Sequence, residues 1–142
     1  MKFWDSSAVI PLLVEEPTTA TILEVRERDP MMLVWWATEI ECVSALARLE
    51  RGGALSADGT GAALARLDAL MPSCAQVQPT DTLRVAARRM LRVHDLRAAD
   101  AQQLAAATVA AEGHPASLEV VSLDQRLLAA ARREGFAIVD VA

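Results

Sequence analysis

Cysteine and histidine are scarce in this chain of 142 residues, which has two of each. Neither Cys42 nor Cys74 stands in a CxxC pair or beside a pair of histidines, so the sequence predicts neither a disulfide framework nor a zinc site. The same cysteine usage favours a reduced, cytoplasmic environment. His94 and His114 fall in or beside expected helix ends, where a solvated side chain is the usual explanation, so a nucleophilic triad is not supported.

Long apolar runs and glycine-rich phosphate loops are also missing. The apolar run 8–14 ends at Glu15 and Glu16, and it is too short and too charged for the apolar part of a signal peptide. No other stretch approaches the roughly 20 apolar residues of a membrane span, so we expect no membrane association. No GxGxxG motif follows the first apolar segment, and Gly52-Gly53 is placed to end a helix, which gives no support to dinucleotide binding.

The overall composition is that of a globular domain. Hydrophobic residues make up 53% of the chain and charged residues 23%, far from the low hydrophobicity and high charge of disordered chains. A chain of this length commonly forms one domain and buries about 70% of the surface of its unfolded state. We therefore expect a single domain over residues 1–142.

The formal net charge is −5, which argues against a wholly basic surface for nucleic acid, because neutralising phosphates takes clustered Lys or Arg. Bound cations would offset part of that charge. Five arginines gather in one short stretch, at Arg84, Arg88, Arg89, Arg92 and Arg97. A solvated helix face explains this stretch best, and a phosphate-facing stripe is the alternative.

Short apolar segments alternate along the chain with longer segments rich in Ala and Leu. This pattern predicts a parallel sheet covered by helices on both faces, that is, a three-layer α/β/α sandwich with about five strands. The expected strands are 2–5, 32–35, 75–78, 120–123 and 137–141. Helices are expected to begin at Thr18, at Thr38 with Glu41 three residues on, at Ser56 and at Thr80, and to end at Gly52-Gly53, Gly113 and Gly135.

Four acids fall where open α/β sheets bind ligands, just beyond the carboxyl ends of the strands. Asp5 ends the first expected strand and Asp124 directly follows the fourth. Glu41 lies in the first turn of the helix after the second strand, and Asp100 opens a long helix. A functional role is therefore weighed for each of them.

Each acid also has a purely structural explanation. Asp5 and Asp124 could do no more than cap the helices that follow them, since Asp accepts hydrogen bonds from helix N–H groups. Glu41 could complete a capping box with Thr38, and Glu39 is a competing candidate for its functional role.

Asp100 is the most informative of the four acids. Leu96, Leu104, Ala107 and Ala111 recur at helical spacing around it and place its carboxylate on an apolar face. A lone buried acid is costly unless it meets a cation or a strong donor, and other acids at the same edge of the sheet cannot serve. A shared divalent cation can, and carboxylate oxygens suit Mg²⁺ or Mn²⁺.

Such a cation supports hydrolysis of phosphodiester bonds. It generates hydroxide from bound water, polarises the phosphoryl oxygens and offsets charge on the leaving oxygen. The carboxylates are then ligands first, and one of them has the less direct role of accepting the proton of the water. Ser7 and Ser122 are close enough in sequence to orient Asp5 and Asp124, although a turn or cap role is more common for such serines.

Four segments carry these acids, namely 3–7 (FWDSS), 38–46 (TEIECVSAL), 96–107 (LRAADAQQLAAA) and 121–127 (VSLDQRL). Together they resemble the PIN domain, and most of all VapC-type toxins. The motifs are short but specific in order and spacing, and the resemblance runs from Asp5 to about Gly135. It implies a Mg²⁺- or Mn²⁺-dependent endoribonuclease, the toxin half of a bacterial toxin–antitoxin pair that cuts tRNA or rRNA.

The resemblance also implies which residues act and what they meet. It assigns the catalytic and metal-binding roles to four residues: Asp5, Glu41, Asp100 and Asp124. Ser7 follows the first acid at the family's spacing, and Glu39 is left as a neighbour of undecided role. A homodimer and a VapB-like antitoxin are implied as partners.

An apolar group near the second expected strand bears on assembly. Its members are Met31, Met32, Trp35 and Trp36. Residues that flank a strand are more often part of the core than of an interface, so a core position is the favoured interpretation.

Two rival interpretations remain. Receiver domains and haloacid-dehalogenase-like phosphatases also place acids at strand ends, but both patterns need a lysine late in the chain, and Lys2 is the only lysine here. The phosphatases further need a second Asp where this chain has Ser7. The non-enzymatic alternative is a catalytically inactive PIN-like binding module, in which the acids only cap helices.

Overall fold

The strands of the protein form one parallel five-stranded sheet in the order β3-β2-β1-β4-β5, in a computed structural model that describes residues 1–141. They are β1 (Lys2–Trp4), β2 (Met32–Trp35), β3 (Ala75–Val77), β4 (Glu119–Val121) and β5 (Ala137–Ile138). All five lie where the sequence predicted strands, although most are shorter. The ends differ because polar residues such as Asp5 leave the sheet to begin the next helix.

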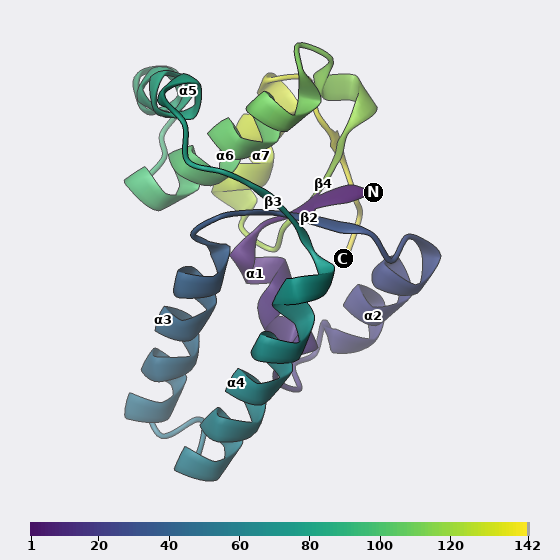
Figure 1. The fold of residues 1–142 in the computed structure, drawn as a ribbon, viewed down its shortest axis with the longest axis vertical. Coiled ribbons are helices and arrows are strands. Elements are labelled where there is room, and N and C mark those ends of the chain that lie inside the picture. The colour runs from purple at the N-terminus through teal and green to yellow at the C-terminus, as the bar shows by residue number, and fades with distance from the viewer. Residues whose placement is uncertain (142) are drawn as a thin grey trace.

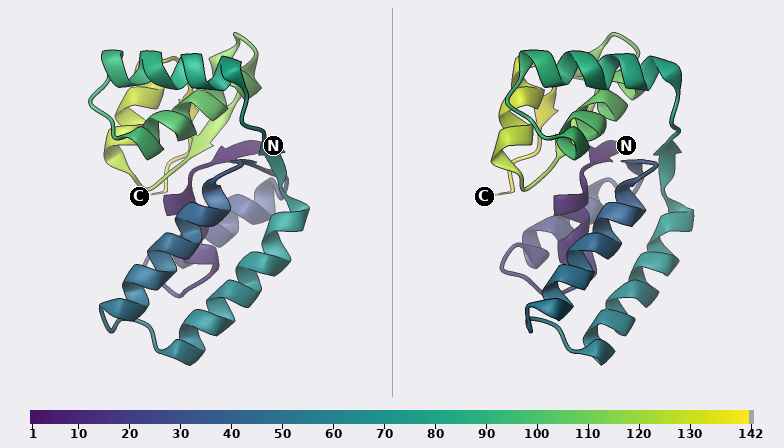
Figure 2. Two further views of the ribbon diagram at one scale, coloured as in Figure 1. Left: turned by 60° about the vertical axis from the view of Figure 1, so that its left-hand side comes forward. Right: turned by 90° about the vertical axis from the view of Figure 1, so that its left-hand side faces the viewer.

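The helices cover both faces of this sheet, so the predicted three-layer α/β/α sandwich is confirmed (Figures 1 and 2). One face carries α1 (Ser6–Val9), α2 (Thr19–Arg28), α3 (Thr38–Arg51) and α4 (Ala57–Leu70), and the other carries α5 (Asp81–Val93), α6 (Ala98–Ala111) and α7 (Gln125–Arg133). Three short 3-10 helices connect elements: η1 (Ile10–Leu12), η2 (Met71–Ser73) and η3 (Pro115–Ser117). None of the helices within residues 1–141 is both long and apolar enough to span a membrane.

Alternation along the strands divides the core in two. Phe3 packs with the buried residues beneath α5, α6 and α7, whereas Trp4 packs with those beneath α1 to α4. In β2, Leu33 and Val34 separate in the same way. Because successive strand side chains point to opposite faces, a strand buried on both sides must be apolar throughout, which is why these segments read as continuous apolar runs.

The helix caps follow the sequence only in part. Ser56 and Thr80 do cap α4 and α5, each accepting a hydrogen bond from the N–H three residues on. Thr18 is the N-cap residue of α2, as predicted, but its side chain makes no capping hydrogen bond. Gly52, Gly113 and Gly135 follow the ends of α3, α6 and α7 as predicted, and Gly135 has a φ of +94°, which favours glycine.

The capping box predicted at Thr38 is also wrong. Ala37 is the N-cap of α3, and Thr38 is the first helical residue, fully buried. The Glu41 carboxylate does not return to the start of its helix but accepts a hydrogen bond from Gln103 of α6. A tertiary contact has replaced the local one, and it draws Glu41 toward the other layer of helices.

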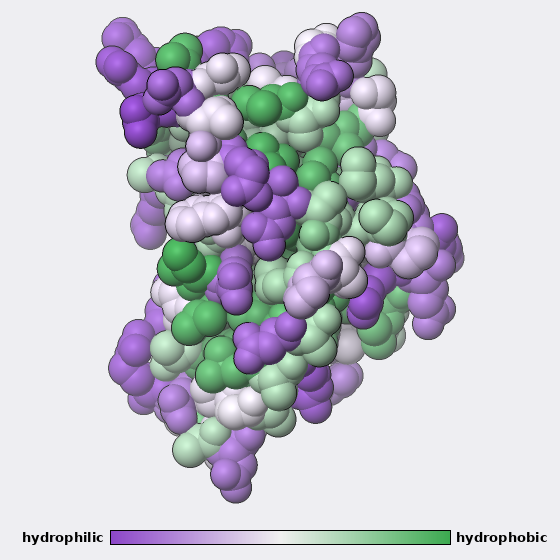
Figure 3. All heavy atoms as spheres, viewed as in Figure 1, coloured by the Kyte–Doolittle hydropathy of each residue, from purple (hydrophilic) through white to green (hydrophobic). Residues whose placement is uncertain are grey.

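The apolar group around β2 is divided between core and surface. Met32 and Trp35 are buried, as favoured from the sequence, but Met31 and Trp36 are about half exposed. Trp36, Ile40 and Val43 follow one another at helical spacing at the start of α3 and are all exposed. Apolar side chains reach the surface over α3 in Figure 3, surrounded by hydrophilic ones.

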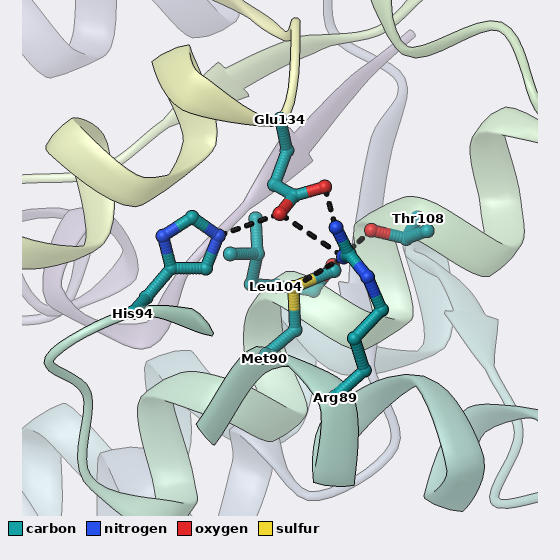
Figure 4. Close-up of polar contacts among 6 residues, drawn as sticks. All are labelled: Arg89, Met90, His94, Leu104, Thr108 and Glu134. Carbon is teal, nitrogen blue, oxygen red and sulfur yellow. Dashed lines mark hydrogen bonds and ion pairs between the residues drawn. The ribbon is translucent and has the colours of Figure 1, made fainter. Parts of the chain in front are cut away.

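His94 is not solvated, contrary to expectation. It follows α5, is 8% exposed, and its Nε2 lies 2.5 Å from Glu134 Oε1 at the end of α7. Arg89 donates from Nη1 to both Glu134 oxygens, at 3.0 and 3.1 Å, so that His94 and Arg89 approach the carboxylate from opposite sides (Figure 4). His114, by contrast, is exposed as predicted. This partly buried cluster, in which the Arg89 side chain is exposed, ties α5 to α7.

The Glu134 cluster should contribute to stability in a pH-dependent way. Burial alone would raise the pKa of Glu134, but the hydrogen bonds from His94 and Arg89 outweigh it and lower the pKa below its usual 4.5. The contribution is therefore complete above about pH 4.5 and is lost as the pH falls through the lowered value. We expect Glu134→Gln to lower the free energy of unfolding by about 1–3 kcal/mol at pH 7 and by less at pH 3.5, measured by urea titration.

The matched control is Glu50→Gln, which removes an exposed carboxylate from α3. It should leave the unfolding midpoint within about 0.5 kcal/mol of the wild type at both pH values. Equal effects of the two substitutions would contradict a stabilising role for the cluster.

Candidate active site

Four predicted acids lie around one edge of the sheet. Asp5 directly follows β1 and Asp124 comes three residues after β4, and these two strands are paired with Trp4 opposite Val121. Glu41 and Asp100 come from the first turns of α3 and α6. A cavity of about 1050 Å³ opens here, and Glu41, Asp100 and Asp124 line it while Asp5 lies buried behind, 3% exposed.

Asp5 is held by two serines. Its Oδ2 accepts hydrogen bonds from Ser7 Oγ at 2.5 Å and from Ser122 Oγ at 2.9 Å, and it also caps α1 by accepting from Ser7 N. Ser122 Oγ accepts in turn from the backbone N–H of Asp124, at 3.0 Å. Both serines therefore orient Asp5, as predicted, whereas Ser122 reaches Asp124 only through its backbone. Burial raises the pKa of Asp5 despite the hydrogen bonds from Ser7 and Ser122, and the charge of Asp124 raises it further.

Glu41 occupies the middle of the site. Its Oε2 accepts from Gln103 Nε2 at 2.8 Å, and its Oε1 accepts from Ser6 Oγ at 3.4 Å. Burial raises the pKa of Glu41 to about 7, and the charges of Asp5 and Asp100 add to the effect. Glu39, the competing candidate, is exposed and does not line the cavity. The geometry favours Glu41.

Asp100 and Asp124 complete the ring of acids. Asp100 is half-buried, less than the apolar face around it suggested, and its pKa is raised by burial and then by the charges of Asp124 and Asp5. Asp124 is the N-cap of α7, accepting from Arg126 N and Leu127 N through Oδ1. The capping explanation for Asp124 is thus correct, but it does not remove the carboxylate from the site, since its charge acts on Asp5 and Asp100.

The sequence did not single out two residues that hold Glu41. Ser6 and Gln103 donate to it, and Gln103 is fully buried with its Nε2 shared between Glu41 and Thr38. The spacing of Gln103 three residues after Asp100 was the available signal, because residues at that spacing lie on one helix face. A glutamine in an Ala-rich helix gave no reason to favour this over a surface position.

Basic residues also border the acidic cavity. Arg48, Arg97 and Arg126 line it, and all three are exposed. Arg97 acts on the pKa of Asp100 through its charge, in the lowering direction. The site thus combines a negative floor with a positively charged rim, a distribution suited to a polyanion whose reacting phosphate meets the acids.

The donor set fits a hard divalent cation in its chemistry. All four acids offer carboxylate oxygens, which such cations prefer. The pKa values of Asp5, Glu41 and Asp100 are raised partly because the acids repel one another, and a cation would relieve that repulsion. In the structure, however, three of the four carboxylates already accept hydrogen bonds from other groups of the protein. Within residues 1–141, no three His, Cys, Asp or Glu side chains have the geometry of a metal site, because Asp5 faces serines, Glu41 faces Gln103 and Asp124 caps a helix.

The fold and the site together define an α/β domain with a carboxylate cluster at the carboxyl ends of parallel strands. The family model of the PIN domain matches residues 2–133. The chain therefore belongs to the PIN domain family, as its motifs indicated. No curated protein matches the chain.

Solved structures of similar fold cover almost the whole chain. FitAcB from Neisseria gonorrhoeae has a TM-score of 0.70 at 16% identity, with 99% of this chain and 98% of that chain covered. A VapC toxin from Mycobacterium tuberculosis that cleaves the sarcin-ricin loop has a TM-score of 0.68 at 18% identity, covering 96% and 97%. A toxin–antitoxin complex from Klebsiella pneumoniae has a TM-score of 0.68 at 13% identity, covering 100% and 98%. At these identities the likeness shows a shared fold.

The mutual repulsion of the acids can be measured directly. In the metal-free protein, the side-chain carboxyl carbon of Glu41 should titrate near pH 7 by NMR, since its pKa is raised to about 7. Asp100→Asn removes one of the charges that raise this pKa, so Glu41 should titrate at a lower pH in the variant, still above 4.5 because burial remains.

The matched control is Asp58→Asn, in the first turn of the equally long α4. It should leave the Glu41 titration unchanged. An identical Glu41 titration in Asp100→Asn and wild type would show that the two carboxylates do not act on each other.

Proposed function

We propose that the protein is a metal-dependent endoribonuclease, acting as the toxin of a toxin–antitoxin pair from a single domain over residues 1–142. The observation that carries this proposal is that four carboxylates, from the end of β1, α3, α6 and the β4–α7 connection, gather at one place and repel one another. Three of them line the cavity and Asp5 lies buried behind it. Caps and solvated acids do not require such convergence. A site that collects negative charge from four separate elements is typical of cation binding.

In this proposal Asp5, Glu41, Asp100 and Asp124 hold Mg²⁺ or Mn²⁺. The bound ion would supply activation of water and neutralisation of charge on the phosphodiester. Because Ser6 and Gln103 donate to the two oxygens of Glu41, a cation would have to share or replace these hydrogen bonds. The raised pKa of Glu41 means that a cation would also have to displace its proton near neutral pH.

The chain's own residues have distinct tasks in this chemistry. Ser7 and Ser122 fix the orientation of Asp5, as hydrogen-bonded groups behind a ligand commonly do. In the metal-free protein Glu41, with a pKa of about 7, can hold or release a proton near neutral pH, and a cation bound to its carboxylate would displace that proton. Arg97 and Arg126 stand at the rim where phosphates on either side of the cut bond would pass.

The neighbours in structure support a proposal for the substrate class and the partners. Because one neighbour cleaves the sarcin-ricin loop and another is a toxin–antitoxin complex, we propose tRNA or rRNA as substrate and a VapB-like antitoxin as partner, in the cytoplasm. The exposed apolar side chains of Trp36, Ile40 and Val43 suit a homodimer contact. The net charge of −5 makes RNA binding depend on local arginines.

The decisive experiment compares two neighbouring glutamates. Total bacterial RNA is incubated with the protein, with and without Mn²⁺ or Mg²⁺, and the cut sites are mapped by 5′-end sequencing. Wild type should cut at a few positions only when the metal is present. Glu41→Gln should lower the cleavage rate by about 100-fold or more, since it removes a charged ligand and proton acceptor.

Glu39→Gln is the matched control, because it removes the same charge two residues away from an exposed position outside the cavity. It should cut at the wild-type rate. If Glu39→Gln loses activity and Glu41→Gln does not, Glu39 holds the cation and Glu41 does not. If wild type and both variants fail to cut, the nuclease proposal is wrong.

A non-catalytic binding module is favoured by one observation, the capping bonds that Asp5 and Asp124 make. Thermal unfolding with added Mn²⁺ separates the two functions. If the acids bind metal, a concentration of 100 times the dissociation constant stabilises wild type by about 2.7 kcal/mol, and Asp100→Asn removes the effect. Equal unfolding temperatures with and without metal would support the binding module.

A further inference from the structure

A second cavity lies beside the acidic one, between α5 and the start of α6. Its volume is about 590 Å³, within the roughly 300–1,000 Å³ of small-ligand sites. Trp35 at the end of β2 and Leu83 and Ala87 of α5 line it as part of the core, and Leu91, 44% exposed, borders it from the next turn of α5. The cavity therefore has an apolar lining that includes a flat indole ring.

Two arginines stand at the mouth of this cavity. Arg84 and Arg88 are exposed, line the cavity, and follow each other by one helical turn on α5. Arg84 forms an exposed ion pair with Asp81 at 3.2 Å, which a stronger anion can displace. Arg88 makes no hydrogen bond or ion pair within residues 1–141. Positive charge thus lies directly beside an apolar hollow.

The first turn of α6 separates the two cavities. Ala98 and Gln102 line the second cavity, whereas Arg97, Ala99 and Asp100 line the acidic one. Ala98 and Ala99 are both exposed, so a strand of nucleic acid can cross this turn without displacing a large side chain. Two cavities on either side of one helical turn are positioned to hold neighbouring units of one polymer.

We propose that the second cavity holds one unpaired nucleotide of the RNA substrate, next to the nucleotide cut at the acids. Its base packs against Trp35, Leu83 and Leu91, and its phosphate meets Arg84 and Arg88. Unpaired bases commonly pack on aromatic and apolar side chains while arginines contact the backbone. This assignment rests on the proposed nuclease function and adds a reason for preferring unpaired RNA.

Charge and shape favour a nucleotide over the other candidates. A second copy docking through this same surface would have to bury two exposed arginines from each chain against one carboxylate, that of Asp81. An extended peptide would need a carboxylate for the arginines and an aromatic side chain for the indole, placed together on neighbouring positions. A nucleotide supplies both a flat base and an anion within one small unit.

The test measures binding without chemistry. NMR spectra of the full-length protein in EDTA are recorded with the four nucleoside 5′-monophosphates and, separately, with inorganic phosphate. We expect nucleotides to shift the signals of Trp35, Ala87 and Leu91, and inorganic phosphate to leave them in place. Shifts of equal size with phosphate alone would overturn the base-binding role.

Two pairs of variants locate the site. Arg88→Glu should weaken nucleotide binding at least tenfold, while Arg133→Glu, the same charge change at an exposed position of α7, should not. Ala98→Trp fills the cavity from an exposed position and should abolish the shifts, while Ala129→Trp, exposed on α7, should keep them. Equal behaviour within each pair would overturn the proposal.

The outcomes separate this proposal from the nuclease function. If the wild-type protein cuts RNA with metal and the Ala98→Trp variant cuts it equally well, the nuclease function stands and the nucleotide site is wrong. A protein that cuts nothing but still binds nucleotides in this cavity loses only the nuclease function. If the Trp35 and Leu91 signals change with protein concentration and not with nucleotide, the surface binds a second copy and the proposal is overturned.

Discussion

Repulsion among carboxylates at one edge of the sheet is the constraint around which the site is built. Because β1 pairs in parallel with β4, Asp5 lies beside the segment that leads from β4 to Asp124. Helices α3 and α6 add Glu41 and Asp100 to the same site. Holding Glu41 protonated to about pH 7 means that folding stability falls as the pH rises from 4.5 toward 7. The proposed cation would relieve this cost, because its charge would offset the repulsion among the carboxylates.

Helix α6 connects this site with the rest of the molecule. It carries Asp100 toward the acids and Gln103 toward Glu41, so one helix sets the positions of two of the four carboxylates. The partly buried cluster of His94, Arg89 and Glu134 links α5 to α7, and both of these helices contact α6. Any movement of α6 would therefore shift the acidic cavity and the neighbouring apolar cavity together.

Local signals predicted the elements well and their contacts poorly. Ser56 and Thr80 cap helices as their local sequence pattern predicted. Glu41 matched the same kind of local pattern, but a buried glutamine offered a better partner across the fold. His94 stands at a helix end, where solvent is the usual environment, yet the end of α7 closes over it. In each failure a residue distant in the chain replaced the local partner.

The sequence by itself determined the alternation of strands and helices along the chain and the α/β class. It also determined the candidate site residues, namely the four acids with Ser7 and Ser122. It could do so because periodicity, caps and motif spacing are local properties of the chain. Tertiary structure alone decided that Gln103 holds Glu41, that Glu39 lies exposed outside the cavity, and that an arginine-bordered cavity lies across one turn of α6. Those facts depend on distances and burial between segments far apart in the chain, which no local pattern encodes.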